Sequence, residues 1–131
     1  MRPMILTMSA FGSYADCVTI DFGQVQQGVF LITGDTGAGK TTIFDGITYA
    51  LYGQTSGGRR DGTMMRSQYA PSGTKTYVDL TFSTGGQVWR VLRSKNSPAN
   101  WICWTTRKPC IKLSKDCGWM PAAHSSVTLP P

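Results

Sequence analysis

The first 96 residues carry apolar and polar positions in patterns typical of regular secondary structure. Residues 4–8 form a short apolar run, whereas residues 17–22 and 77–82 alternate between apolar and polar side chains. These patterns predict strands, the alternating ones half-buried. Residues 11–14 indicate a turn that carries two aromatic side chains. A Ser-Thr-Gly-Gly turn then joins residues 77–82 to a returning strand at 87–93, which predicts a hairpin.

Between these strands lies a different pattern. Residues 29–32 are continuously apolar, which predicts a strand buried on both faces. Residues 41–52 have helical spacing, and Gly53 supplies a stop. Residues 53–74 are rich in Gly, Ser, Thr and Arg and predict a long surface loop. The apolar stripe of the predicted helix consists of Ile43, Ile47, Ala50 and Leu51.

The pattern changes abruptly near residue 97. Residues 97–131 hold three of the four Cys, three of the four Trp and five of the seven Pro, without a helical or strand period longer than a few residues. We therefore interpret residues 1–96 as one folded segment and 97–131 as an irregular tail that contributes no core element.

The segment between the apolar run and the helix carries the clearest chemistry. Residues 34–41 fit the phosphate-loop pattern G-x-x-x-x-G-K-[ST] without a mismatch. The glycines let the backbone curl so that its N–H groups point into one concavity, and the following helix adds its positive N-terminus. Lys40 is placed to reach the β- and γ-phosphates of a nucleotide, and the Thr41 hydroxyl to ligate Mg²⁺. The predicted nucleotide-binding residues are Gly34, Asp35, Thr36, Gly37, Ala38, Gly39, Lys40, Thr41 and Thr42.

Other candidate sites are weaker. Three cysteines and one histidine in the tail recur every seven residues, but zinc sites usually contain close pairs and Pro and Gly interrupt this segment, so we interpret the thiols as incidental. Three arginines of the Gly-rich loop could contact phosphate, although a solvated loop is the simpler interpretation. Asp79 lies in an alternating strand and is interpreted as a solvent-face residue. These cysteines, histidine and arginines are Cys103, Cys110, Cys117, His124, Arg59, Arg60 and Arg66.

Composition sets the remaining limits. The chain has 131 residues, enough for one domain, and 40% apolar residues describe a soluble globular protein. No apolar stretch approaches the roughly 18 residues that a membrane helix needs, and the N-terminus lacks the apolar core of a secretion signal, so we expect a cytoplasmic protein. The net charge of +6 permits a nucleic-acid partner. All seven acidic residues are Asp, so this chain cannot supply a catalytic glutamate.

A longer string of residues resembles the SbcC family, the ATPase subunits of the bacterial SbcCD nuclease and relatives of the SMC proteins. The resemblance lies in Phe11-Gly12-Ser13-Tyr14, the stretch from Phe30 through the P-loop to Asp45, and Ala50-Leu51-Tyr52-Gly53. It continues through residues 64–70 and 77–82 and the strand at 89–93, and so covers residues 1 to about 95.

The resemblance implies the N-terminal lobe of an ABC-type ATPase head, an α/β P-loop NTPase. In that family the head is assembled from the two ends of a long chain, and two heads sandwich ATP. ATP-driven engagement of the heads gates the access of double-stranded DNA to a partner nuclease in DNA repair and recombination. The resemblance therefore implies ATP and Mg²⁺ as cofactors, and it places the loop near Met65 close to the base or ribose. The implied partners are the C-terminal half of the head, an SbcD-like nuclease, DNA and a second head.

The sequence also departs from the family. After Ser94 it does not continue toward the Q-loop glutamine, and it has no signature motif, no Walker B strand and no catalytic Glu. Asp35 and Asp45 lie nearest the phosphate loop in sequence, and we expect both carboxylates to face away from a bound nucleotide. We therefore name no catalytic residue and expect ATP binding without hydrolysis by this chain alone. The alternatives are another P-loop enzyme, such as a small nucleotide kinase, and a non-catalytic nucleotide- or DNA-binding segment.

Overall fold

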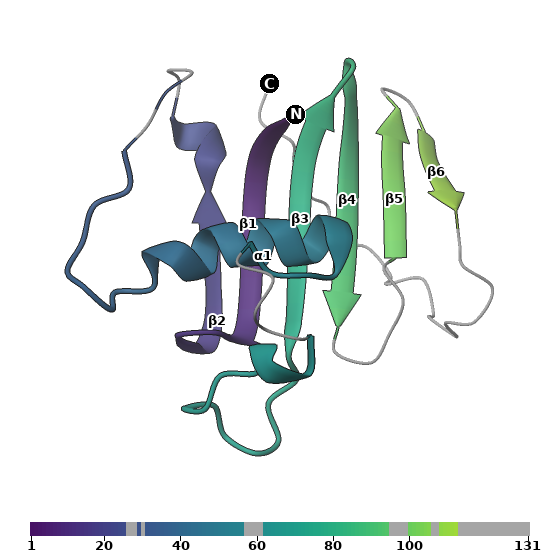
Figure 1. Cartoon of the computed structure of the whole chain (residues 1–131). Coiled ribbons are helices and arrows are strands. Elements are labelled where there is room, and N and C mark those ends of the chain that lie inside the picture. Colours follow the sequence, from purple (N-terminus) through teal and green to yellow (C-terminus); the bar gives the residue numbers. More distant parts are fainter. Residues whose placement is uncertain (26–28, 30, 57–61, 95–99, 106–107, 113–131) are drawn as a thin grey trace.

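Six strands of the described residues form one antiparallel sheet, and a long helix crosses one of its faces (Figure 1). This computed structural model describes residues 1–25, 29, 31–56, 62–94, 100–105 and 108–112. The strand order is β2-β1-β3-β4-β5-β6, and every neighbouring pair is antiparallel. The strands are β1 (Arg2–Phe11), β2 (Tyr14–Asp21), β3 (Tyr77–Thr84), β4 (Gln87–Ser94), β5 (Asn100–Thr105) and β6 (Lys108–Lys112). The helix α1 spans Lys40–Tyr52, and two short 3₁₀ helices span Phe22–Gln24 (η1) and Gly62–Met65 (η2).

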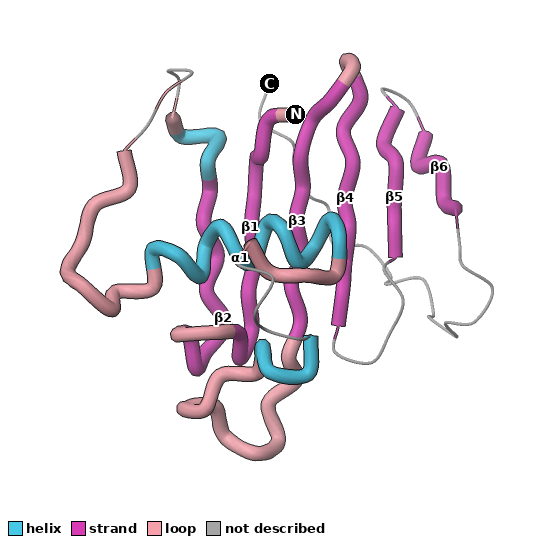
Figure 2. Tube along the Cα trace, viewed as in Figure 1, coloured by secondary structure: helices cyan, strands magenta, loops and turns pink. Residues whose placement is uncertain are grey.

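The loops before and after α1 lie in different places. Figure 2 shows the loop before α1 running beside the β2 edge of the sheet. The segment around η2 lies instead at the end where β1 turns into β2. Two backbone bonds fix that position, because the Gly12 amide donates to the Met65 carbonyl at 2.8 Å and the Ser67 amide to the Ala10 carbonyl at 2.8 Å.

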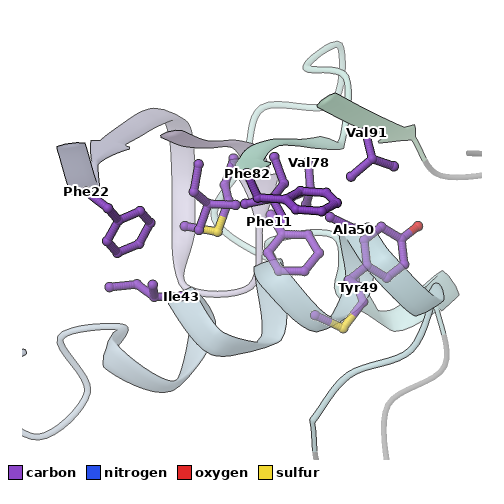
Figure 3. Packing of buried hydrophobic residues seen from close by; sticks show 12 residues of the cluster. Phe11, Phe22, Ile43, Tyr49, Ala50, Val78, Phe82 and Val91 are labelled. Atoms are coloured by element: carbon purple, nitrogen blue, oxygen red, sulfur yellow. The ribbon is translucent and has the colours of Figure 1, made fainter. Parts of the chain in front are cut away.

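The core lies between α1 and the sheet (Figure 3). Strand alternation sends every second side chain toward the helix, so Leu6 and Met8 of β1 are fully buried. Gly46 lets α1 approach this layer closely, since a Cβ at this position would lie 2.6 Å from the Met8 Sδ. Phe11 packs against Tyr49 with ring centroids 5.4 Å apart and the rings tilted by 45°, which ties the end of β1 to the last turns of α1. The buried apolar cluster consists of Leu6, Met8, Phe11, Phe22, Ile43, Tyr49, Ala50, Met65, Val78, Leu80, Phe82 and Val91.

The C-terminal end of α1 is held by the neighbouring strand β4. Gly53 ends the helix in the left-handed region at φ 75°, and its amide donates to the Tyr49 carbonyl at 2.8 Å. The guanidinium of Arg93 donates to the carbonyls of Ala50 at 3.2 Å and Leu51 at 3.5 Å. A cation at this position complements the negative end of the helix dipole, so β4 helps to fix the axis of α1.

Most predicted elements are confirmed. The strand predicted at residues 4–8 extends to Arg2–Phe11, and the alternating segments at 17–22 and 77–82 fall mainly in β2 and in β3. The hairpin turn at Gly85 and Gly86 has positive φ at both positions, as a two-residue hairpin turn requires.

The strand predicted at residues 29–32 is wrong for the residues that the structure describes there. Val29 and Leu31 belong to no strand, and their side chains are 86% and 85% exposed. Ile32 packs partly against the core. A β-strand needs a hydrogen-bonded neighbouring strand, and no described strand pairs with this segment.

The prediction that residues 97–131 form an irregular tail is also wrong for their described part. β5 pairs with β4 through partners such as Val91 and Trp101, and β6 pairs with β5. The backbone of these segments continues the sheet without a clear alternating sequence, because ladder hydrogen bonds are made by the main chain. Residues 113–131, with Cys117 and His124, lie outside the described residues. The division of the chain into two domains at residue 96 stays a prediction.

The presence of β5 and β6 gives truncation of the chain an expected effect. Ending the chain after Ser94 would remove β5 and β6 and leave the edge of β4 unpaired. We expect a lower melting temperature by circular dichroism and self-association by light scattering, because an uncovered edge recruits other strands. An unchanged melting temperature and a monomeric truncated chain would show that β5 and β6 do not stabilise the sheet.

Among the described residues, no helix has both the length and the apolar character needed to cross a membrane.

Candidate nucleotide-binding site

The phosphate-loop motif lies at the entry to α1 and curls as its glycines allow. The Ala38 amide donates to the Asp35 carbonyl at 3.1 Å, which closes a turn. Gly37 and Gly39 follow with φ of 87° and 84°, a region that side chains with a Cβ rarely adopt. A Cβ at Gly37 would meet no atom within 4 Å, so the tip of the loop is open to a ligand. Residues 33–38 are all exposed.

The N-terminus of α1 is suited to an anion. Gly39 is the N-cap, and no side chain of the described residues caps the helix there. The first turn contains no acidic residue. The first amide N–H groups of a helix have no partner within the helix, and they carry its partial positive charge. A phosphate at this position would satisfy donors that the protein itself leaves without a side-chain cap.

Lys40 lies across the loop. Its Nζ donates to the carbonyls of Gly34 and Asp35, each at 2.6 Å. The ammonium therefore lies beside the same turn that Asp35 closes, and it joins the start of the loop to the start of the helix. Because the side chain is only half-buried, it can also reach a ligand at the loop.

The two threonines after Lys40 lie in different environments. Thr41 is exposed, whereas Thr42 is only 6% exposed and lies next to the β1–β2 turn. The hydroxyls of Thr42 and Ser13 are 3.1 Å apart and hydrogen-bonded. One position later, the Tyr14 hydroxyl donates to the Gly39 carbonyl at 3.3 Å. The strand pattern predicted a turn at these residues but not a contact with the P-loop, because segments so far apart in sequence leave no periodic signal of their contact.

Met65 is placed differently from the rest of the predicted set. Its side chain is 1% exposed and belongs to the core, while its carbonyl accepts the Gly12 amide. Binding of a base or ribose near Met65 stays a prediction, and in this structure it would have to use the backbone or neighbouring side chains. The next residue, Arg66, donates to the carbonyls of Thr74 and Pro71, so it organises its own loop. Arg59 and Arg60 lie outside the described residues.

Two acidic side chains, Asp45 and Asp79, have partners away from the phosphate loop. The Asp45 carboxylate is 8% exposed and accepts the amide and hydroxyl of Ser56, beyond the far end of α1. Asp79 lies on the sheet face opposite α1 and pairs with Arg90, with 14% of its side chain exposed. This hydrogen bond with Asp79 raises the pKa of the Arg90 guanidinium. Asp79 is therefore on the open face, as expected, but is held in an ion pair.

The outer surface of α1 exposes large apolar side chains. Phe44 is 53% exposed and Tyr52 is 74% exposed. Both belong to the side of the helix that faces away from the sheet, whereas Tyr49 is buried.

Burial raises the pKa of the Tyr49 hydroxyl, and the nearby Arg93 guanidinium partly offsets this increase. Arg93 lies 5.9 Å from the centre of the Tyr49 ring.

The comparison with known proteins assigns the chain to a family. The sequence matches the family of AAA domains over residues 6–114. This chain belongs to the AAA domain family. The matched range of this AAA domain begins in β1, includes the P-loop and α1, and runs through β6.

Several curated relatives of this AAA domain are SbcC subunits of the SbcCD nuclease. The chain is 46% identical over 95 residues to the SbcC subunit of Lactococcus lactis, covering 72% of this chain and 9% of the relative. It is 44% identical over 94 residues to the SbcC subunit of Vibrio cholerae, covering 71% and 9%. The SbcC subunit of Treponema pallidum is 41% identical over 134 residues, covering 98% and 12%. The resemblance to the SbcC family is thereby confirmed, and the chain spans about a tenth of the length of these relatives.

Proposed function

We propose that this AAA domain binds ATP with Mg²⁺ through residues 34–42, as part of an SbcC-like ATPase. The uncapped N-terminus of α1 is the observation that carries this proposal. Three features support it together: an open glycine loop, a helix that offers amide donors without a side-chain cap, and one ammonium lying across the loop. An anion with several oxygens fits this set of donors.

The Mg²⁺ ion would be held through Thr41. Its hydroxyl belongs to an exposed residue in the first turn of α1, next to Lys40. Mg²⁺ usually keeps several waters and takes few protein ligands beside the phosphates, so a single hydroxyl is a sufficient protein contribution. The ion would offset the negative charge of the bound phosphates, while the loop and Lys40 hold their position.

The rest of an ABC-type head would cover apolar side chains that are exposed before α1 and along its outer side. Val29, Leu31, Phe44 and Tyr52 are all more than half exposed, although side chains of this kind are usually buried. The chain spans only about a tenth of its curated relatives, so a C-terminal half from the remaining length is the partner that we propose for this surface. A second head, an SbcD-like nuclease and double-stranded DNA complete the proposed assembly, which would gate DNA access to the nuclease.

We expect this chain to bind ATP without turning it over. Hydrolysis requires a group that orients the attacking water, and the seven acidic residues include no Glu. Asp45 is bonded to Ser56, and Asp79 is paired with Arg90 on the other face of the sheet.

Phosphate release from ATP in the presence of Mg²⁺ measures hydrolysis directly. The chain alone should release none above buffer, and release should appear when the C-terminal half of an SbcC-family relative is added. Steady release by the chain alone, lost in Lys40→Ala, would overturn the need for a second half. ATP binding without release in either mixture would favour a non-catalytic binding segment.

A further inference from the structure

The β1–β2 turn contacts the phosphate loop at two successive residues. Ser13 reaches the Thr42 hydroxyl at 3.1 Å, and Tyr14 reaches the Gly39 carbonyl at 3.3 Å. The approach is tight on both sides. A Cβ at Gly12 would lie 2.5 Å from the Thr42 Cγ2, and a Cβ at Gly39 would lie 2.9 Å from the Tyr14 hydroxyl. Both glycines have positive φ, so the backbone itself is shaped for this contact.

The contact with Gly39 has a consequence for the helix N-terminus. In a trans peptide the carbonyl and the following N–H point in opposite directions. The bond from Tyr14 fixes the carbonyl of the Gly39–Lys40 peptide on the side of the β1–β2 turn. The Lys40 N–H is thereby directed away from that turn. This N–H is among the first amides of α1, which no described side chain caps.

The contact with Thr42 orients a hydroxyl in a similar way. A threonine hydroxyl has one proton to donate and two lone pairs to accept with. Thr42 is 6% exposed, so few partners can reach its hydroxyl, and Ser13 is one of them. When Ser13 donates its proton to Thr42, the Thr42 proton remains available for an acceptor at the loop.

We propose that Ser13 and Tyr14 are positioning residues of the phosphate site. They act through the Thr42 hydroxyl and the Gly39–Lys40 peptide, and they do not need to touch the nucleotide. The inference rests on the proposed binding of ATP by residues 34–42. It adds a second segment to the phosphate site, about 20 residues before the P-loop in the sequence. The contacts of this segment with the loop strengthen phosphate binding.

A double-mutant cycle tests the link between Ser13 and Thr42. Calorimetric titration with ATP and Mg²⁺ is carried out on the parent, Ser13→Ala, Thr42→Val and the double variant. We expect each single variant to bind about fivefold more weakly, the scale of one lost hydrogen bond, and the double variant to bind no more weakly than Thr42→Val. Ser13→Thr, which keeps the hydroxyl, should restore most of the affinity. Tyr14→Phe, which removes only a hydroxyl, should weaken binding by a similar factor.

Thr7→Val is the matched control. The Thr7 and Thr19 hydroxyls are 3.0 Å apart and also join β1 to β2, but they are on the open face of the sheet. This variant should bind ATP as the parent does, and all variants should keep the parent's melting temperature within a few degrees.

The outcomes separate the inference from the function on which it rests. A parent that binds ATP while Ser13→Ala and Tyr14→Phe bind equally well overturns the inference alone. Fully additive losses in the double variant overturn the action of Ser13 through Thr42. A parent that binds no ATP overturns the proposed function, and the inference with it.

Discussion

Replacing Lys40 with alanine is expected to weaken the binding of ATP and Mg²⁺ by at least about 2 kcal/mol, roughly thirtyfold, the scale of a lost charge-assisted contact. Lys40 is the cation of the motif, and its Nζ lies 2.6 Å from two carbonyls of the phosphate loop. The substitution removes the charge and also the link between the start of the loop and α1. Isothermal titration calorimetry on the parent and the variant measures the difference.

Lys75→Ala is the matched control for this prediction. Lys75 is exposed and lies in the segment before β3, and its carbonyl accepts the Ser9 hydroxyl. The substitution removes the same charge but no contact with the P-loop, so ATP affinity should change by less than about twofold, as expected for a distant, screened charge. Equal losses for the two variants would mean that net charge, and not the loop geometry, governs binding.

The second large effect is expected in the core beneath α1. Leu6 is fully buried, and its side chain lies close to Gly46 of the helix. Replacing a buried leucine with alanine removes apolar contacts and leaves a cavity, which costs about 2–5 kcal/mol. Leu6→Ala should therefore lower the free energy of unfolding by that amount in urea titrations. A chain of this size has only about 5–15 kcal/mol of stability, so this variant should approach unfolding.

Leu31→Ala provides the comparison, because the same side chain is removed where it is 85% exposed. A surface change of this kind should stay within about 0.5 kcal/mol of the parent. If Leu31→Ala were as destabilising as Leu6→Ala, the segment before the P-loop would be packed in solution and not exposed.

Sequence patterns predicted the strands whose apolar side chains are buried by α1. β2 and β3 alternate because α1 covers one face of the sheet and leaves the other open. The apolar run at 29–32 gave the wrong prediction because an apolar run does not by itself provide a strand to pair with. No described strand pairs with this segment, and Val29 and Leu31 are exposed. β5 was missed because its pairing with β4 is made by the backbone, which leaves little trace in the sequence.

The candidate site was also predictable from the sequence only in part. The spacing of glycines and Lys40 is local, so the motif could be found without a structure. The contacts of Ser13 and Tyr14 with the loop depend on how the β1–β2 turn is placed against α1, and that placement follows from tertiary packing. The burial of Met65 is also a tertiary effect, because its segment docks on the end of β1 through backbone bonds that any residue could make.

The most direct test of nucleotide binding at this loop is a map of the amides that respond to ATP. Amide chemical shifts of the ¹⁵N-labelled chain are followed by NMR during titration with ATP and Mg²⁺. We predict saturable shifts at Gly37, Gly39, Lys40 and Thr41, where the loop and the helix N-terminus offer their N–H groups. Amides near Asp79, on the open face of the sheet, should remain unchanged. Shifts concentrated on that open face, or no saturable shifts at all, would contradict the claim that this loop is a nucleotide site.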